Sequence, residues 1–88
     1  MDPTTIQYLL DTYGAENIAY IAFGSGKTYY IKCEAHNRPG YHSVTFDIVN
    51  QLCIVTIAVP TVGDAAAVTI NAVHMSYVES IGFYPAVA

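Results

Sequence analysis

Closely spaced turn signals divide most of this chain into segments that are too short for long helices. Residues 24–27, 37–40 and 61–64 each contain Gly together with Pro, Ser, Asn or Asp, the residue types that tight turns require. The segments between them either alternate apolar and polar residues or are rich in β-branched residues, which is typical of strands. We therefore expect short strands from about residue 18 to residue 83.

The segment before these strands has the pattern of a single helix over residues 3–13. Asp2 is a suitable N-cap, Pro3 occupies the first helical position, and Gly14 follows the last turn. One apolar face repeats at the helical spacing and consists of Ile6, Leu9, Leu10 and Tyr13. A helix of this length is marginal by itself, so its apolar face is expected to pack on the strands.

The strand pattern predicts one mainly β domain that spans residues 1–88. The expected strands cover residues 18–23, 28–34, 43–48, 52–59, 66–73 and 78–83. The first two form a hairpin in which Gly supplies a positive φ. Pro39 and Gly40 predict a type II turn before the third strand. Five or six short strands after one helix favour a small barrel or a strongly bent antiparallel sheet.

Charged residues make up only 11% of the 88 residues, whereas hydrophobic residues make up 53%. An average protein has about 25% charged residues, so the surface of this domain must be unusually apolar. The simplest explanation is that other copies of the chain cover part of it, which predicts a homo-oligomer. The length excludes Rossmann domains, TIM barrels and P-loop NTPases, which need more strands and helices.

The net charge of −4 argues against a general nucleic-acid or membrane-surface binder. The only cationic side chains besides histidine are Lys27, Lys32 and Arg38. The apolar stretch 52–73 is interrupted by Pro60 and by a turn signal, so it is not expected to cross a membrane. The first residues lack the basic region of a secretory signal, and we expect a cytoplasmic protein.

The two cysteines, Cys33 and Cys53, lie 20 residues apart without a metal-binding or redox spacing. Two buried thiols are favoured over a disulfide, which is consistent with a reducing compartment.

Motifs that carry catalytic chemistry are weak, so we expect no enzymatic activity and no cofactor. Residues 24–28 read Gly-Ser-Gly-Lys-Thr, as at the end of a P-loop, but Ile21 replaces the required first Gly and a strand follows. A hairpin turn is the favoured interpretation. His36, His42 and His74 lack zinc-ligand spacing, even with Glu34 or Cys33, so exposed loop histidines are favoured over a metal site.

The sequence contains eight Tyr and no Trp. Tyr stacks on unpaired bases in single-stranded nucleic-acid recognition. It is also common in interfaces and cores, because it covers a large area with few rotatable bonds. Interface or core packing is favoured for most of these residues.

Two segments resemble motifs of the Sm/Lsm/Hfq family. Residues 46–50, Phe-Asp-Ile-Val-Asn, are similar to the family phrase Phe-Asp-x-x-Met-Asn but are one residue shorter. Residues 73–81 match the apolar frame of the second family motif at Val73, Val78 and Ile81. His74 and Met75 stand where the family has Arg and Gly. The order of helix and strands is similar over nearly the whole chain, as in a divergent, possibly phage-encoded member.

The resemblance implies an Sm-like barrel of five strands, or six with an extra strand between residues 42 and 59. It also implies a homo-oligomeric ring of five to seven subunits, in which the fourth strand of one copy pairs with the fifth strand of the next. The loops around its central pore would bind single-stranded RNA. The residues expected there are Asp47, Asn50, His74, Met75 and Ser76. The missing Arg and the acidic charge leave an alternative open, a ring that assembles proteins without affinity for RNA.

Overall fold

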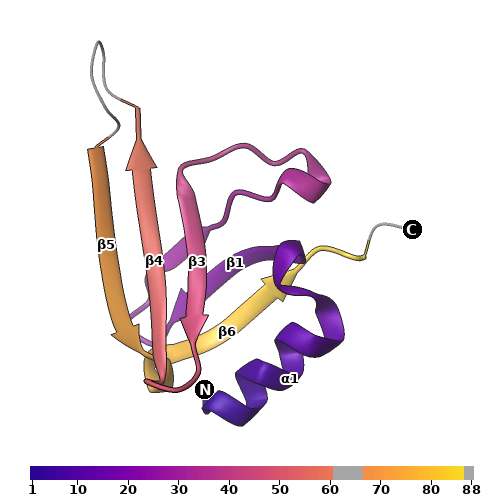
Figure 1. Ribbon diagram of the computed structural model, residues 1–88, viewed down its shortest axis with the longest axis vertical. Coiled ribbons are helices and arrows are strands. Elements are labelled where there is room, and N and C mark those ends of the chain that lie inside the picture. The colour runs from indigo at the N-terminus through magenta and orange to yellow at the C-terminus, as the bar shows by residue number, and fades with distance from the viewer. Residues whose placement is uncertain (61–66, 87–88) are drawn as a thin grey trace.

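The computed structural model describes residues 1–60 and 67–86, and shows one helix followed by six antiparallel strands (Figure 1). The elements are α1 (Pro3–Tyr13), β1 (Ile18–Phe23), β2 (Thr28–Tyr30), β3 (His42–Asp47), β4 (Leu52–Val59), β5 (Ala67–His74) and β6 (Val78–Phe83). Three short 3-10 helices, η1 (Ala15–Asn17), η2 (Glu34–His36) and η3 (Met75–Tyr77), connect them. No helix in these residues has the length and apolar character needed to span a membrane.

Helix α1 begins and ends where its capping residues predict. The Asp2 carboxylate accepts a hydrogen bond of 2.7 Å from the Thr5 amide, and the Gly14 amide closes the last turn on the Leu10 carbonyl. Ile6 is completely buried, which confirms that the apolar face packs on the rest of the domain. The amino group of Met1 donates to the carbonyl of Val78 at 2.8 Å, so the start of α1 is joined to β6.

The strands form two three-stranded sheets, with strand orders β2-β1-β6 and β3-β4-β5 (Figure 1). The predicted β1-β2 hairpin is confirmed: the Phe23 amide donates to the Lys27 carbonyl at 2.8 Å, and Gly26 has φ +94°. A strand, and not a helix, follows residues 24–28, so this segment is a hairpin turn. The turn expected at residues 61–64 lies outside the described residues.

The expected closed barrel is wrong, because the two sheets do not close on each other. They are joined at one side, where the Lys32 amide donates to the His42 carbonyl at 2.8 Å. At the other side, β5 and β6 pair only with β4 and β1, respectively, in the described chain. The connection η3 turns the chain between these two strands, so each keeps an unpaired edge. We refer to this side of the molecule, between β5 and β6, as the open seam.

The segment between β2 and β3 also differs from the expected type II turn. Gly40 does not have a positive φ, whereas Asn37 has φ +55° and ends η2 in the left-handed conformation. Cys33 and Arg38 form an isolated antiparallel bridge around this tight excursion. Asn tolerates the left-handed region, so the reversal is completed two residues before Pro39.

The core lies between the inner faces of the two sheets. Its buried members come from both, and include Ile18, Ile21 and Phe23 of β1 and Cys53 and Val55 of β4. Both cysteines are buried free thiols, as expected, and burial raises the pKa of Cys53 to about 11. Desolvation of the thiolate is the physical cause, and it makes this thiol a poor nucleophile.

Gly82 allows an aromatic ring to lie flat on the outer face of the β2-β1-β6 sheet. It pairs with Tyr20 on β1, and a Cβ atom at Gly82 would overlap the Tyr20 ring. We expect Gly82→Ala to lower the free energy of unfolding by about 1–3 kcal/mol, because overpacking displaces the ring. Urea unfolding of Gly82→Ala, Tyr20→Ala and the double variant measures this. Additive effects of the two substitutions would contradict the proposed contact.

Candidate functional site

The two segments that the sequence analysis selected lie together at one end of the β3-β4-β5 sheet. The β4-β5 register places Leu52 opposite His74, which brings the β3-β4 turn next to η3. The Met75 amide then donates to the Gln51 carbonyl at 2.8 Å. The pairing of β4 with β5 therefore positions both segments, and we call the group Asp47, Asn50, His74 and Ser76 the turn cluster.

Asp47 holds Asn50 with two hydrogen bonds across the β3-β4 turn. The main-chain amide of Asn50 donates to Oδ1 at 3.1 Å, and its side-chain amide donates to Oδ2 at 2.9 Å. Gln51 completes the turn with φ +58°. The Asn50 side chain is exposed, and its amide oxygen is directed by the bond that its nitrogen makes. This arrangement presents a fixed hydrogen-bonding group at the surface.

The same hydrogen bonds lower the pKa of Asp47 below its ordinary value of 3.8. The side-chain amide of Asn50 has the largest effect, followed by the main-chain amide of Asn50. Because both bonds favour the charged carboxylate, their contribution to stability is present above about pH 4 and is lost as the pH falls through the lowered pKa.

Asn50→Ala is expected to raise the pKa of Asp47 toward 3.8, because the side-chain donor is removed. Titration of the Asp47 carboxyl carbon by NMR measures this shift directly. Val49→Ala is the matched control, because Val49 lies in the same turn, is 90% exposed, and contributes only its main chain. An unchanged Asp47 titration in Asn50→Ala would contradict the role of the side-chain bond.

His74 and Ser76 form a second local unit at the start of η3. Nδ1 of His74 accepts a hydrogen bond from the Ser76 amide at 3.1 Å and lies 2.8 Å from the Ser76 hydroxyl. The neutral ring that accepts at Nδ1 carries its proton on Nε2, which is then available as a donor. Both residues are exposed, so the turn cluster offers an amide, an imidazole and a hydroxyl to a ligand.

Met75 differs from the other expected site residues because its side chain has no exposed area. Its amide and carbonyl also have partners, in Gln51 and in the amino group of Met1. Met75 therefore contributes packing beneath η3, and its side chain is not presented to a ligand.

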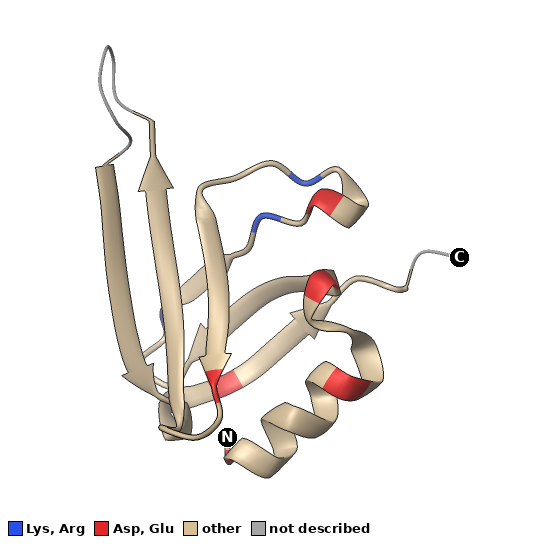
Figure 2. Cartoon of the chain, in the orientation of Figure 1, with Lys and Arg blue, Asp and Glu red and all other residues tan. Residues whose placement is uncertain are grey.

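Cationic side chains lie away from the turn cluster (Figure 2). Lys27 lies over the Tyr29 ring, Arg38 lies over the Tyr84 ring, and Lys32 is 3.6 Å from Glu34. The charged residue within the cluster is Asp47. Because RNA affinity depends strongly on neutralised phosphates, this distribution is a weak electrostatic basis for RNA binding by one copy.

The three histidines do not converge on a common site. His36 shares a hydrogen bond of 2.9 Å with Asn17, His42 packs against Tyr29 at 5.5 Å between ring centroids, and His74 contacts Ser76. His36 and His42 are half-buried, so the expectation of exposed loop histidines holds only for His74. Among residues 1–60 and 67–86, no group of three or more His, Cys, Asp or Glu side chains could hold a metal ion.

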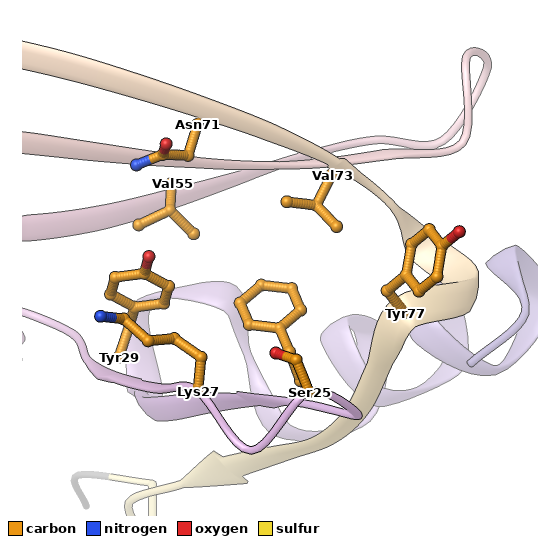
Figure 3. Close-up of a pocket in the computed structure, with 8 residues that line it drawn as sticks. Ser25, Lys27, Tyr29, Val55, Asn71, Val73 and Tyr77 are labelled. Atoms are coloured by element: carbon orange, nitrogen blue, oxygen red, sulfur yellow. The ribbon is translucent and has the colours of Figure 1, made fainter.

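An apolar pocket of about 310 Å³ opens between the two sheets, and sequence reasoning did not identify it (Figure 3). We call it the intersheet pocket. Its lining residues are Phe23, Ser25, Lys27, Tyr29, Val55, Asn71, Val73 and Tyr77. They come from β1, β2, β4, β5, η3 and the 24–27 turn, so no local motif contains them. The alternation within each strand indicated inward-facing positions, but not that a space remains between them.

Comparisons with protein-family models, with curated proteins and with solved structures give no significant match to this chain. The local geometry of its residues is therefore the basis for a functional proposal.

Proposed function

We propose that this chain is a non-enzymatic subunit of a homo-oligomeric, Sm-like ring, in which β5 of one copy pairs with β6 of the next. The ring serves as a module for protein assembly. The observation that carries the proposal is the open seam, where two strands of the same domain each keep an unpaired edge. The two free thiols fit a reducing compartment, and we assign the ring to the cytoplasm.

Strand β5 lacks the features that normally protect an edge strand from association. Proteins block exposed edges with charged side chains, Pro, bulges or very short strands. β5 has eight residues and contains no Pro, Lys, Arg, Asp or Glu (Figure 2). Val68 and Ile70 are 59% and 66% exposed, although they are among its most apolar residues. Pairing with another copy would satisfy the unpaired main-chain groups and remove apolar area from water.

A ring accounts for both edges of the open seam. If β5 paired with β5 of a second copy, the edge of β6 would stay unpaired in each subunit. Pairing of β5 with β6 of the next copy is a head-to-tail contact, and rotation about a closed axis then removes every free edge. The order of the strands around the bent sheets, and the resemblance of residues 46–50 and 73–81 to Sm motifs, support a closed ring of five to seven copies.

Light scattering coupled to size-exclusion chromatography tests the ring. The expected mass is that of five to seven copies of the 9.5-kDa chain. Ile70→Lys, which places a charge on the edge strand, is expected to shift the mass to that of one chain, because desolvating an unpaired charge is costly. Val49→Lys adds the same charge on an exposed turn and is expected to leave the mass unchanged. A wild-type monomer at micromolar concentration would refute the proposal.

A second candidate function, binding of single-stranded RNA at the turn cluster, is favoured by the way Asp47 fixes the Asn50 amide. A fixed amide beside an imidazole donor can form hydrogen bonds to the edge of an unpaired base. A ring would repeat this group around its axis and place several weak contacts on one strand, which raises the overall affinity.

The 260/280 nm absorbance ratio of the purified oligomer and binding of fluorescent oligouridine in low salt test this candidate. Asn50→Ala and His74→Ala are each expected to weaken binding about tenfold per hydrogen bond to the base. Val49→Ala is the control within the same turn. No RNA affinity in an intact wild-type ring would exclude this second function and leave the assembly function in place.

A further inference from the structure

The intersheet pocket has the composition of a small-ligand site. Its floor is apolar and buried, because Val55 has no exposed area and Phe23 is only 6% exposed. A few groups able to form hydrogen bonds, among them Ser25 and Asn71, lie around this floor. Such a combination of an apolar wall with few polar groups is typical of sites that bind and orient small molecules.

Side chains from the two sheets point toward the same space (Figure 3). Val55, Asn71 and Val73 project from β4 and β5, and Tyr29 projects from β2 on the opposite wall. The Phe23 and Tyr29 rings meet edge to face, with their centroids 5.9 Å apart and an interplanar angle of 82°. An aromatic ring inserted between these walls would gain edge and face contacts beyond its buried area.

Lys27 is the charged residue of the lining, and no carboxylate lines the pocket. Its Nζ lies 5.3 Å from the centroid of the Tyr29 ring, at the side of the pocket. Within the described residues, the one ion pair joins Lys32 to Glu34, so Lys27 has no carboxylate partner there. A cation beside an apolar cavity favours a ligand that has an anionic head and an apolar body.

We propose that the intersheet pocket binds a small aromatic monocarboxylate, with the ring between the two sheets and the carboxylate on Lys27. The volume of about 310 Å³ corresponds to roughly ten water molecules and lies at the lower end of ligand pockets. A single ring with a short acidic side chain fits this space. The proposal does not depend on the ring of subunits, because all the lining residues belong to one chain.

An NMR titration of the ¹⁵N-labelled protein, in whatever oligomeric state it adopts, tests this site. The probes are 3-phenylpropionate, its neutral amide and phenethylamine, which share the aromatic ring and differ in charge. We expect saturable shifts of the amide signals of Tyr29, Asn71 and Val73 with the carboxylate. The neutral amide should bind about tenfold more weakly, and the amine more weakly still, because Lys27 favours only the anion.

Two matched lysine variants separate a site from general electrostatic attraction. Lys27→Gln is expected to weaken binding of the carboxylate about tenfold and to leave binding of the neutral amide unchanged. Lys32→Gln removes the same charge outside the pocket and should have no effect. Val73→Phe fills the pocket and should abolish binding, with folding checked from the dispersion of the spectrum. Equal binding of acid and amide, equal effects of the two lysine variants, or no saturable binding would each overturn the proposal.

Discussion

Met75→Ala is expected to lower the free energy of unfolding by about 2–5 kcal/mol, the range for buried large-to-alanine substitutions. The side chain of Met75 has no exposed area and lies in η3, between β5 and β6. Its removal would leave a cavity at the point where the chain crosses from one sheet to the other. Since domains of this kind are stable by only about 5–15 kcal/mol, the loss is a large fraction of the total.

Urea unfolding followed by circular dichroism measures this effect, with Ser76→Ala as the control. Ser76 is the next residue in η3 and is exposed, so its substitution should change stability by less than about 1 kcal/mol. The comparison also separates packing from ligand contact. Under conditions in which both variants are folded, Met75→Ala should retain any affinity of the turn cluster for RNA. Equal stability of the two variants would contradict the structural role of Met75.

Asn17→Ala is expected to have an effect of similar size for a different reason. The Asn17 side chain is 4% exposed, and joins the Tyr13 carbonyl at 2.9 Å to Nε2 of His36 at 2.9 Å. Alanine would leave both partners without this bond, at a cost of about 1–3 kcal/mol for each group that stays buried. The main-chain bond from Tyr84 to the Asn17 carbonyl, at 2.8 Å, would remain.

Thermal and urea unfolding of Asn17→Ala measures the loss, and Glu16→Ala, an exposed neighbour, is the control. Asn17 connects the end of α1 to η2 and to the segment after β6, so hydrogen exchange should increase in all three. An increase restricted to η1 would show that the residue acts only locally. His36→Ala removes one of the two partners, and its effect should overlap with that of Asn17→Ala in the double variant.

Local patterns in the sequence were sufficient for α1 and for the strands. The cap at Asp2, the Pro at position 3 and the Gly at position 14 each act on neighbouring residues, and the helix spans Pro3–Tyr13 as predicted. The β1-β2 hairpin followed in the same way from its glycines. Strand alternation predicted which residues face inward, such as Ile21 and Val55, because successive side chains point to opposite faces.

The turn cluster was found from a resemblance, and its internal geometry came from the fold. The sequence places Asp47 three residues before Asn50, and a carboxylate at this spacing commonly binds the backbone of a turn. That this turn lies beside His74 depends on the β4-β5 register, which places Leu52 opposite His74. Burial of Met75 was not evident from its position in a motif, because it depends on how η3 packs between the sheets.

The sequence by itself determined one capped helix, short strands, buried thiols and a surface with few charges. Each of these depends on the conformational preferences of adjacent residues or on composition. Only the tertiary structure decided that the sheets stay open between β5 and β6, and that a pocket remains between Phe23 and Val73. Both features are sums over contacts between residues far apart in the chain. Closure or opening therefore depends on the relative positions of η3 and the two sheets, which no short segment specifies.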